Sequence, residues 1–410
     1  MTVLVQHAAD LHVGAAWSFR QPAAPSAGRP LRIVHVVPAI GQGGAERVLA
    51  ELVRHTPHVL HRIVTLTAGP PFFDFGTADI VPLGLARGEV SLTALRRARE
   101  AARDFAPDVV HGWLYHGNLA GSLMALRGVP LLWSVHNTSL PRDGSKWLTR
   151  QIARLGGPLS RLSLSRLAPD RIVYCSPSAR AWHEQRLGYR PGPGGVIGNG
   201  VDFAAFAFDP TARAKLRAAW GLAETQVAIG TIGRFDPQKD HAGIATALAL
   251  LDRRDAVWVL AGDGCHPANP ALAAILDRHG LRSRSLPLGP RGDMPAILSA
   301  LDLLVIGSAF GEAMPVVAVE ALANDLPVVA TRVGSVEPLV GDPARLAMPR
   351  HPADLARAIG AAWPGPPAGR RLGAVVGRRV GLAADYAVGA MAASYHQLYR
   401  DLAPAAAGQR

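Results

Sequence analysis

The sequence predicts an α/β protein of two domains, each built on a parallel β-sheet covered by helices. Short runs rich in β-branched residues alternate with segments of helical period along most of the chain, which is typical of βαβ units. This alternation starts again near residue 205, and 410 residues are too many for one ordinary core. Hydrophobic residues make up 49% and charged residues 18%, a composition that indicates a globular chain.

The first half begins with a strand at 31–40, LRIVHVVPAI, a run that suits a buried position. A glycine turn follows, and apolar residues then recur at helical spacing up to residue 53. The same alternation continues through the strand 61–69, the helix 91–106, the strand 107–113, the helix 119–128, the strand 129–137 and the strand–helix unit 170–188.

The second half repeats the pattern. Its expected elements are the strand 226–233, the helix 240–252, the strand 256–264, the helix 270–280, a short strand at 284–289, the helix 293–301, the strand 302–308, the helix 315–324 and the strand 326–334. A last amphipathic helix at 385–403 needs a surface for its apolar face, and we expect the first half to provide it.

These elements divide the chain into four parts. We expect a flexible lead-in at 1–29, a first domain at 30–204, a second domain at 205–384 and the closing helix at 385–410. The lead-in lacks the pattern of an export signal, and the longest uncharged run, 109–126, divides into a strand, a turn and a helix. The cysteines Cys175 and Cys265 fit no metal or redox spacing. We therefore expect a soluble, cytoplasmic protein.

The net charge of +12 is concentrated in one region. From Arg142 to Arg190 there are ten Lys or Arg residues against three Asp or Glu, and leucines alternate with arginines in part of it. Such a basic amphipathic segment suits an anionic membrane surface or a charged partner, and a solvated helix face is the alternative. A nucleic-acid partner is not expected, because no aromatic-interleaved basic strand or recognition-helix pattern is present.

Two groups of candidate binding residues follow predicted strands, where open parallel sheets bind ligands. Gly43 and Gly44 follow the first strand and open a helix, so their N–H groups could approach an anion, although a tight turn without a ligand explains them equally well. Arg234 and Lys239 follow the strand 226–233 and form a candidate clamp for a diphosphate, with simple surface basicity as the alternative.

Two acids lie inside the apolar segment 306–334. Glu312 is expected on the loop before a helix that starts at Pro315, and Glu320 further along that helix. Paired carboxylates suit the hydroxyls of ribose or hexose, and an unpartnered buried carboxylate would be costly. Paired acids also catalyse glycoside hydrolysis, but the neighbouring cations argue against that use.

Five motifs in order, GGAERVLAEL, VIGNGVD, IGRFDPQKD, E-AMPVVAVE and LPVVATRVG, resemble the signature set of the retaining glycosyltransferases of family 4. The resemblance spans about residues 31–340. It implies the GT-B fold, in which two Rossmann-like, doubly wound domains face each other across a cleft. It also implies a hexose transferred from a UDP-, GDP- or ADP-linked sugar to a saccharide or lipid-linked acceptor, in polysaccharide or glycolipid biosynthesis.

The resemblance assigns roles to residues. Arg234 and Lys239 would hold the donor diphosphate, Glu312 the hexose hydroxyls and Glu320 the ribose. His136, in SVHN after a strand, falls where the family often has a histidine near the reacting sugar, although a lone histidine there is often structural. The full expected donor site comprises Gly43, Gly44, Arg234, Lys239, Glu312, Ala313, Met314, Pro315, Val316 and Glu320.

Ala313 and Met314 depart from the usual Gly-Phe of the family motif, which puts the fit of the hexose in question. Neither a cofactor nor a divalent metal is expected, because no Asp-x-Asp lies in a suitable setting. A nucleotide-sugar epimerase of the same fold and a non-catalytic nucleotide-sugar-binding scaffold are the alternatives to a transferase. Peripheral attachment to the inner face of the cytoplasmic membrane would follow if the basic segment binds lipid.

Overall fold

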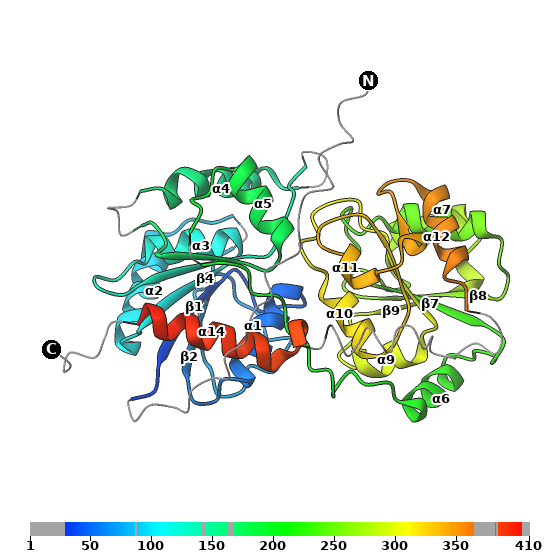
Figure 1. Ribbon diagram of the computed structural model, residues 1–410, viewed down its shortest axis with the longest axis horizontal. Coiled ribbons are helices and arrows are strands. Elements are labelled where there is room, and N and C mark those ends of the chain that lie inside the picture. Colours follow the sequence, from blue (N-terminus) through cyan, green and yellow to red (C-terminus); the bar gives the residue numbers. More distant parts are fainter. Residues whose placement is uncertain are drawn as a thin grey trace, which may run out of the picture.

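The computed structural model describes residues 29–86, 88–141, 145–162, 167–192, 194–364, 382 and 384–403. Two α/β domains lie side by side (Figure 1), and each contains one six-stranded parallel sheet. The predicted GT-B architecture is confirmed. The expected lead-in, apart from Arg29, lies outside the described residues, as do parts of the basic segment at 142–144 and 163–166.

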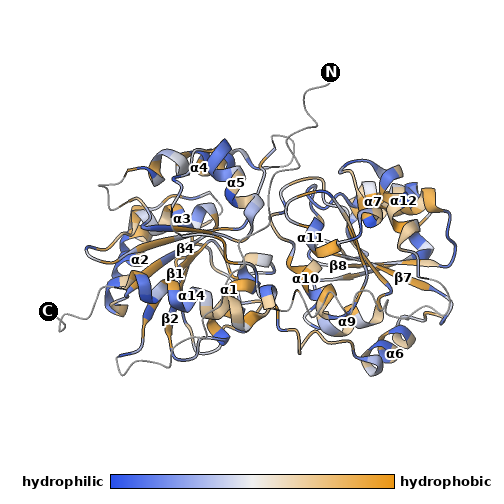
Figure 2. Ribbon diagram, in the orientation of Figure 1, coloured by the Kyte–Doolittle hydropathy of each residue, from blue (hydrophilic) through white to orange (hydrophobic). Residues whose placement is uncertain are grey.

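The sheet of the first domain has the order β3-β2-β1-β4-β5-β6. Its strands are β1 (Arg32–Val37), β2 (Leu60–Thr65), β3 (Asp79–Pro82), β4 (Val109–Trp113), β5 (Leu131–Val135) and β6 (Arg171–Tyr174). The central strands β1, β4 and β5 are almost wholly buried, as expected of parallel strands covered on both faces. Figure 2 shows these strands as hydrophobic, whereas the outer helices are mixed in character.

Among the described residues, five helices of the first half cover this sheet, and a sixth comes from near the end of the chain. They are α1 (Gly44–Arg54), α2 (Leu92–Phe105), α3 (Leu114–Leu123), α4 (Trp147–Ser160), α5 (Pro177–Arg186) and α14 (Val388–Leu402). Figure 1 shows α14 lying across the first domain beside α1. Met391, Tyr395 and Tyr399 of α14 join the buried cluster that contains Ile33 and Leu49, so the closing helix completes the core of the first domain.

The sheet of the second domain has the order β12-β11-β10-β7-β8-β9. Its strands are β7 (Val227–Ile232), β8 (Ala256–Ala261), β9 (Ser285–Gly289), β10 (Leu303–Ile306), β11 (Val328–Thr331) and β12 (Leu346–Ala347). The helices are α6 (Pro210–Ala219), α7 (His241–Leu251), α8 (Pro270–Arg278), α9 (Met294–Ala300), α10 (Val316–Ala323), α11 (Glu337–Val340) and α12 (Pro352–Ala361), with the 3₁₀ turns η1 (Arg282–Arg284) and η2 (Pro343–Arg345).

In the described part of the chain, the segment that leaves the first domain near Val201 touches the segment that returns to it before α14. Val201 N donates to Tyr386 O over 2.9 Å, and Val388 N donates to Val201 O over 2.9 Å. A Cβ on Gly200 would lie 2.7 Å from Val388 Cα, which is closer than real Cβ atoms approach. Glycine is therefore needed where the two segments pack together. Within the described ranges, none of the helices has the length and apolar character needed to span a bilayer.

Candidate functional site

A cleft of about 620 Å³ lies between the domains, at the carboxyl ends of the strands of both sheets. It is lined by all eleven predicted site residues: Gly43, Gly44, His136, Arg234, Lys239, Glu312, Ala313, Met314, Pro315, Val316 and Glu320. The structure thus brings the predicted residues together in one cleft. Their roles toward a ligand stay predictions.

The N-termini of helices from the two domains meet at this cleft. Gly43 is the N-cap of α1, and a Cβ there would lie 2.1 Å from Glu46 Oε2. A Cβ on Gly44 would lie 3.7 Å from Val316 Cγ2, at the start of α10. Pro315 is the N-cap of α10 rather than its first residue, a correction of the sequence prediction, because its ψ of 114° is extended. Two helix N-termini facing one space favour an anionic ligand.

Glu312 is held by a cation and a hydroxyl. Lys239 Nζ forms an ion pair with Glu312 Oε1, and Ser308 Oγ donates to the same oxygen over 2.8 Å. Glu312 is only 8% exposed, so the charge of its carboxylate is balanced locally. Two predicted ligand-binding side chains thus serve as each other's partners in this structure.

The loop that carries Glu312 is fastened by the other domain. Thr138 Oγ1 donates to Glu312 O over 2.7 Å, and Gly311 N donates to Ser139 Oγ over 3.0 Å. Asn199 Nδ2 donates to Met314 O over 3.2 Å. These bonds join the domains on one side of the cleft.

The alanine that departs from the family motif is accommodated by packing. Ala313 is 2% exposed and joins a buried cluster of the first domain that includes Val135 and Cys175. The neighbouring turn is tight, because Gly334, at φ 71°, would place a Cβ 1.9 Å from Glu312 O. The methyl group of Ala313 therefore contributes to the contact between domains.

Glu320 pairs with a residue that the sequence-based reasoning did not single out. Arg47 Nε, on α1, lies 3.0 Å from Glu320 Oε1, and the guanidinium also lies over the ring of Phe206 at 4.9 Å. Burial raises the pKa of Glu320, and Arg47 opposes that shift. Arg47 stands within the quoted motif GGAERVLAEL, but nothing in its spacing shows that it reaches a carboxylate of the other domain.

Arg234 is the exposed member of the predicted clamp. It follows β7, lines the cleft and makes no ion pair with any other residue that the structure describes. Glu46 of α1 lies near enough for Arg234 to lower the pKa of its carboxyl, although burial is the larger effect and raises that pKa. A cation from the second domain and the start of α1 therefore face the same space.

His136 lies at the cleft end of β5 with its ring stacked on Trp113, at 5.3 Å between ring centroids. Both of its ring nitrogens are buried and have no hydrogen-bond partner. Burial lowers the pKa of His136 to about 4, and the side chain of Asn199 opposes this shift. The imidazole is therefore neutral at neutral pH, with one donor and one acceptor available for a ligand.

Behind Trp113 lies a buried chain of histidines. Trp113 Nε1 donates to His35 Nδ1 over 3.1 Å, so His35 carries its proton on Nε2 and donates to His61 Nδ1 over 2.9 Å. His61 then donates through Nε2 to Thr56 Oγ1 over 2.9 Å, and Thr56 donates to a backbone carbonyl. Every proton in this chain has a defined place, so the ring of Trp113 beneath His136 is held rigidly.

Within the described part of the chain, no three His, Cys, Asp or Glu side chains gather in a geometry that could hold a metal ion.

Comparison with known proteins agrees with the fold. Residues 42–205 match the model of the family described as Glycosyltransferase Family 4, and residues 226–363 match that of Glycosyl transferases group 1. The chain is 28% identical over 316 residues to the protein named glycosyltransferase EpsF of Bacillus subtilis strain 168, covering 72% of this chain and 78% of that protein.

One further relative and one solved structure are informative. A D-inositol 3-phosphate glycosyltransferase of Mycobacterium marinum is 33% identical over 150 residues, which are 36% of this chain and about a third (32%) of that protein. The solved structure of HepE from Anabaena with UDP and glucose superposes with a TM-score of 0.75 at 20% identity, covering 90% of this chain and all of that one.

Proposed function

The chain carries the two domains of a GT-B glycosyltransferase, and from this premise we propose that it transfers a hexose from a nucleotide-diphosphate sugar to an acceptor hydroxyl, with retention of configuration. The observation that carries the proposal is the convergence of two cations and two buried carboxylates on one interdomain cleft, from the loop after β7, the loop before α10 and α10 itself. The UDP and glucose in the HepE structure support a nucleotide sugar as the donor.

In this proposal Arg234 and Lys239 bind the diphosphate. Lys239 Nζ already points into the cleft, where it meets Glu312, and phosphate oxygens would share or replace that contact. As the bond between the sugar and the diphosphate breaks, negative charge grows on the leaving oxygen, and the fixed cations stabilise it. The N–H groups at the starts of α1 and α10 add to this stabilisation. These groups do the work for which other enzymes use a divalent metal, so we propose metal-independent transfer.

The carboxylates bind hydroxyls. Glu312 would accept hydrogen bonds from the hexose, and Glu320 from the ribose, each through oxygens that already lie at the cleft. His136 is placed at the same cleft with two unpartnered ring nitrogens. As a neutral imidazole it would bind a hydroxyl of the reacting sugar rather than act as an acid.

The transfer itself needs few groups. The acceptor oxygen bonds to the anomeric carbon on the face from which the diphosphate departs. The carbon–oxygen bond to the diphosphate breaks, and its electron pair stays with the leaving phosphate. That phosphate then takes the proton of the acceptor hydroxyl, so the products are the glycoside and the nucleoside diphosphate. Closure of the domains would exclude water, which would otherwise hydrolyse the donor.

The acceptor is proposed to be a saccharide or a lipid-linked saccharide in polysaccharide or glycolipid biosynthesis. The relative from Mycobacterium marinum is named for D-inositol 3-phosphate, so phosphate-bearing acceptors are included among the candidates.

We also propose that the protein works in the cytoplasm at an anionic membrane surface, through α4. Large apolar side chains are exposed along this helix beside exposed Arg154: Trp147 is 64%, Leu155 56% and Leu162, just beyond the helix, 50% exposed. Sedimentation with vesicles should retain the protein on anionic but not on zwitterionic phospholipid, and Trp147→Ser should weaken retention. Equal recovery in the supernatant with both vesicles would refute this part.

The donor proposal is tested by a thermal-shift screen with UDP, GDP and ADP sugars. One nucleotide class should raise the melting temperature, and Lys239→Ala should abolish the shift. Lys215→Ala is the matched control, since Lys215 is an exposed lysine on α6 of the same domain. A shift that survives Lys239→Ala unchanged would show that the clamp is wrongly assigned.

Incubation of the protein with its donor in the absence of an acceptor distinguishes a transferase from a non-catalytic scaffold and from an epimerase. The measured quantity is the release of nucleoside diphosphate. A transferase should hydrolyse its donor slowly, and a scaffold should not. An epimerase should return a donor with an altered sugar, which chromatography of the nucleotide sugar detects.

A further inference from the structure

Arg150 is partly buried, and two nitrogens of its guanidinium lack partners. On α4, the residues Ala153, Gly156, Gly157 and Ser160 are buried, and Arg150 precedes Ala153 by about one turn on the same face. Its Nε and Nη1 atoms are buried and make no hydrogen bond. Leaving buried donor atoms of a charged group unpaired is costly, so this side chain is suited to an acceptor atom that none of the described residues supplies.

Two more basic side chains lie at the same place. Lys146 is the N-cap of α4, and it lies near enough to His116, in the first turn of α3, to lower the pKa of that histidine in addition to the effect of burial. Neither α3 nor α4 has an acidic residue in its first turn. In the part of the chain that the structure describes, no carboxylate pairs with Lys146 or Arg150. His116, Lys146 and Arg150 are named here the basic cluster.

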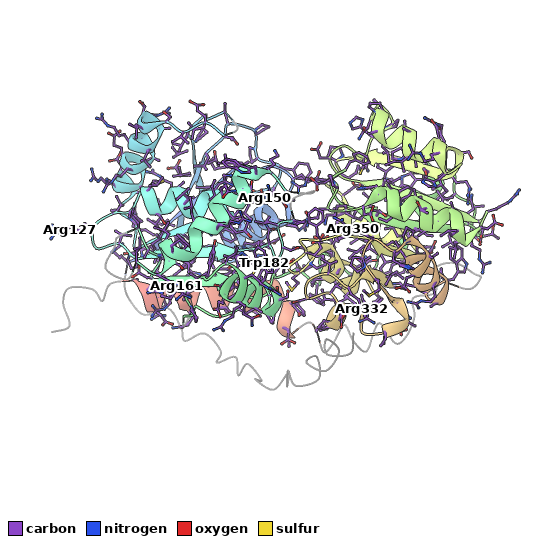
Figure 3. All side chains as sticks on the ribbon, turned by 90° about the horizontal axis from the view of Figure 1, so that it is seen from above. Arg127, Arg150, Arg161, Trp182, Arg332 and Arg350 are labelled. Carbon is purple, nitrogen blue, oxygen red and sulfur yellow. The ribbon has the colours of Figure 1, made fainter. Side chains whose placement is uncertain are left out.

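The basic cluster flanks the cleft on the first-domain side. Leu114, two residues before His116, lines the cleft, and so does Asn137, at the end of the strand that leads to α4. Figure 3 shows Arg150 on the side of the first domain that faces the second domain. Arg234 and Lys239 belong to the second domain, so the basic cluster lies outside the proposed clamp for the donor diphosphate.

We propose that the basic cluster binds a phosphate group of the acceptor, and hence that the acceptor is a phosphate monoester or diphosphate. The inference rests on the proposed transfer function and deepens it. The guanidinium fork of Arg150 matches two phosphate oxygens, and Lys146 adds a mobile point charge. The aligned N–H groups at the starts of α3 and α4 also favour the binding of an anion. The phosphate would anchor the acceptor while its hydroxyl reaches the donor sugar.

Titration calorimetry tests the inference directly. The protein is first saturated with the nucleoside diphosphate that the donor screen identifies, so that Arg234 and Lys239 are occupied, and inorganic pyrophosphate is then added. Wild-type protein should bind it, and Arg150→Gln should weaken binding at least tenfold, whereas Arg150→Lys should weaken it less. Arg154→Gln is the control, because Arg154 is exposed on the same helix. Equal affinity in Arg150→Gln and Arg154→Gln would overturn the proposal.

Lysine footprinting provides a second readout that needs no variant. The chain has three lysines, Lys146, Lys215 and Lys239, and their acylation can be followed by mass spectrometry. In the presence of the nucleoside diphosphate, pyrophosphate should protect Lys146 and leave Lys215 unchanged. If acylation of Lys146 does not change at a pyrophosphate concentration that saturates the calorimetric signal, the anion binds elsewhere and the proposal is overturned.

Two probes separate the sources of the phosphate. A short-chain prenyl diphosphate that binds much more tightly than pyrophosphate would indicate a lipid-linked acceptor, and equal affinities would indicate a water-soluble phosphate ester. Either result supports an acceptor phosphate. The donor thermal shift should be the same in wild-type protein and Arg150→Gln, so failure of this inference is distinguishable from failure of the donor proposal.

Discussion

Arg47 of the first domain and Glu320 of the second form an ion pair across the cleft, with Arg47 Nε 3.0 Å from Glu320 Oε1. Glu320 is 4% exposed, so its carboxylate depends on this cation. The carboxylate that we propose for the donor ribose is therefore also a contact between the domains. If Glu320 binds the ribose as proposed, donor binding and the contact between the domains share this one residue.

Removing the cation should destabilise the protein. Arg47→Met keeps the apolar stem but leaves Glu320 buried without a partner, which costs about 3–5 kcal/mol for a fully buried pair and less here because Arg47 is partly exposed. We expect a clear fall in melting temperature. Arg54→Met is the control, since Arg54 is an exposed arginine at the end of the same helix. Equal melting temperatures for the two variants would show that the pair contributes nothing.

The role of Glu320 can be tested with the ligand instead of the protein. The nucleoside diphosphate found in the donor screen should bind wild-type protein at least tenfold more tightly than its 2′,3′-dideoxy form, since a charged hydrogen bond contributes about 1.5–3 kcal/mol. Glu320→Ala should bind the two forms equally. Glu337→Ala, at an exposed acid of the same domain, should keep the preference. If Glu320→Ala still binds the nucleoside diphosphate more tightly than its dideoxy form, the ribose hydroxyls do not bind to this carboxylate.

Much of the fold could be predicted because the strands are short, apolar and regularly separated by helical segments. The helices α6 and α12, of ten residues each, were not predicted. Three further elements were missed because they are short. β3, β12 and α11 have four, two and four residues, too few to show a period, and β3 ends in a proline. Their identity is set by hydrogen bonds to neighbouring strands or turns, which no local pattern reveals.

The candidate site was predictable where its residues follow strands, because topology brings such residues to one edge of a sheet. Arg47 was missed for the opposite reason. It lies within a helix, and its importance comes from a contact with Glu320 in three dimensions. Arg150 was part of the predicted basic segment, but its sequence position does not distinguish it from the other arginines of that segment.

The pH dependence of catalysis should not contain the titration of His136. Burial lowers the pKa of this imidazole to about 4, so it stays neutral from pH 5.5 to 8. His136→Ala should lower kcat at least tenfold through loss of a sugar contact, while the shape of the kcat profile over that range stays the same. If kcat of the wild-type protein changes with pH near 6.5 and this change disappears in His136→Ala, then His136 titrates there and the proposal that it stays neutral is wrong.

Stability, in contrast, should fall in mild acid. Burial lowers the pKa of His35 and His111 well below the usual value and that of His61 to about 4. The unfolded chain therefore binds more protons between about pH 6.5 and 4, so the stability is complete above that window and is lost as the pH falls through it.

Each such histidine adds up to about 1.4 kcal/mol per pH unit to the slope. Urea unfolding from pH 7.5 to 4.5 measures it. His61→Gln, which can still donate to Thr56, should flatten the slope, and His58→Gln, at an exposed histidine, should not. A slope that is identical in all three proteins would exclude His61 as a source of the acid sensitivity.

Gly200 tests the packing of the two segments that connect the domains. A Cβ there would lie 2.7 Å from Val388 Cα and 2.8 Å from Met391 Cβ, and neither atom can move without shifting α14 from the core of the first domain. Gly200→Ala should therefore cost about 1–3 kcal/mol and lower the melting temperature. Gly389→Ala makes the same chemical change in open space on α14, where alanine favours the helix by up to about 1 kcal/mol, so its melting temperature should rise. Opposite signs for two identical substitutions can arise only from their surroundings, and a Gly200→Ala protein as stable as wild type would mean that the crossing segments are not in contact.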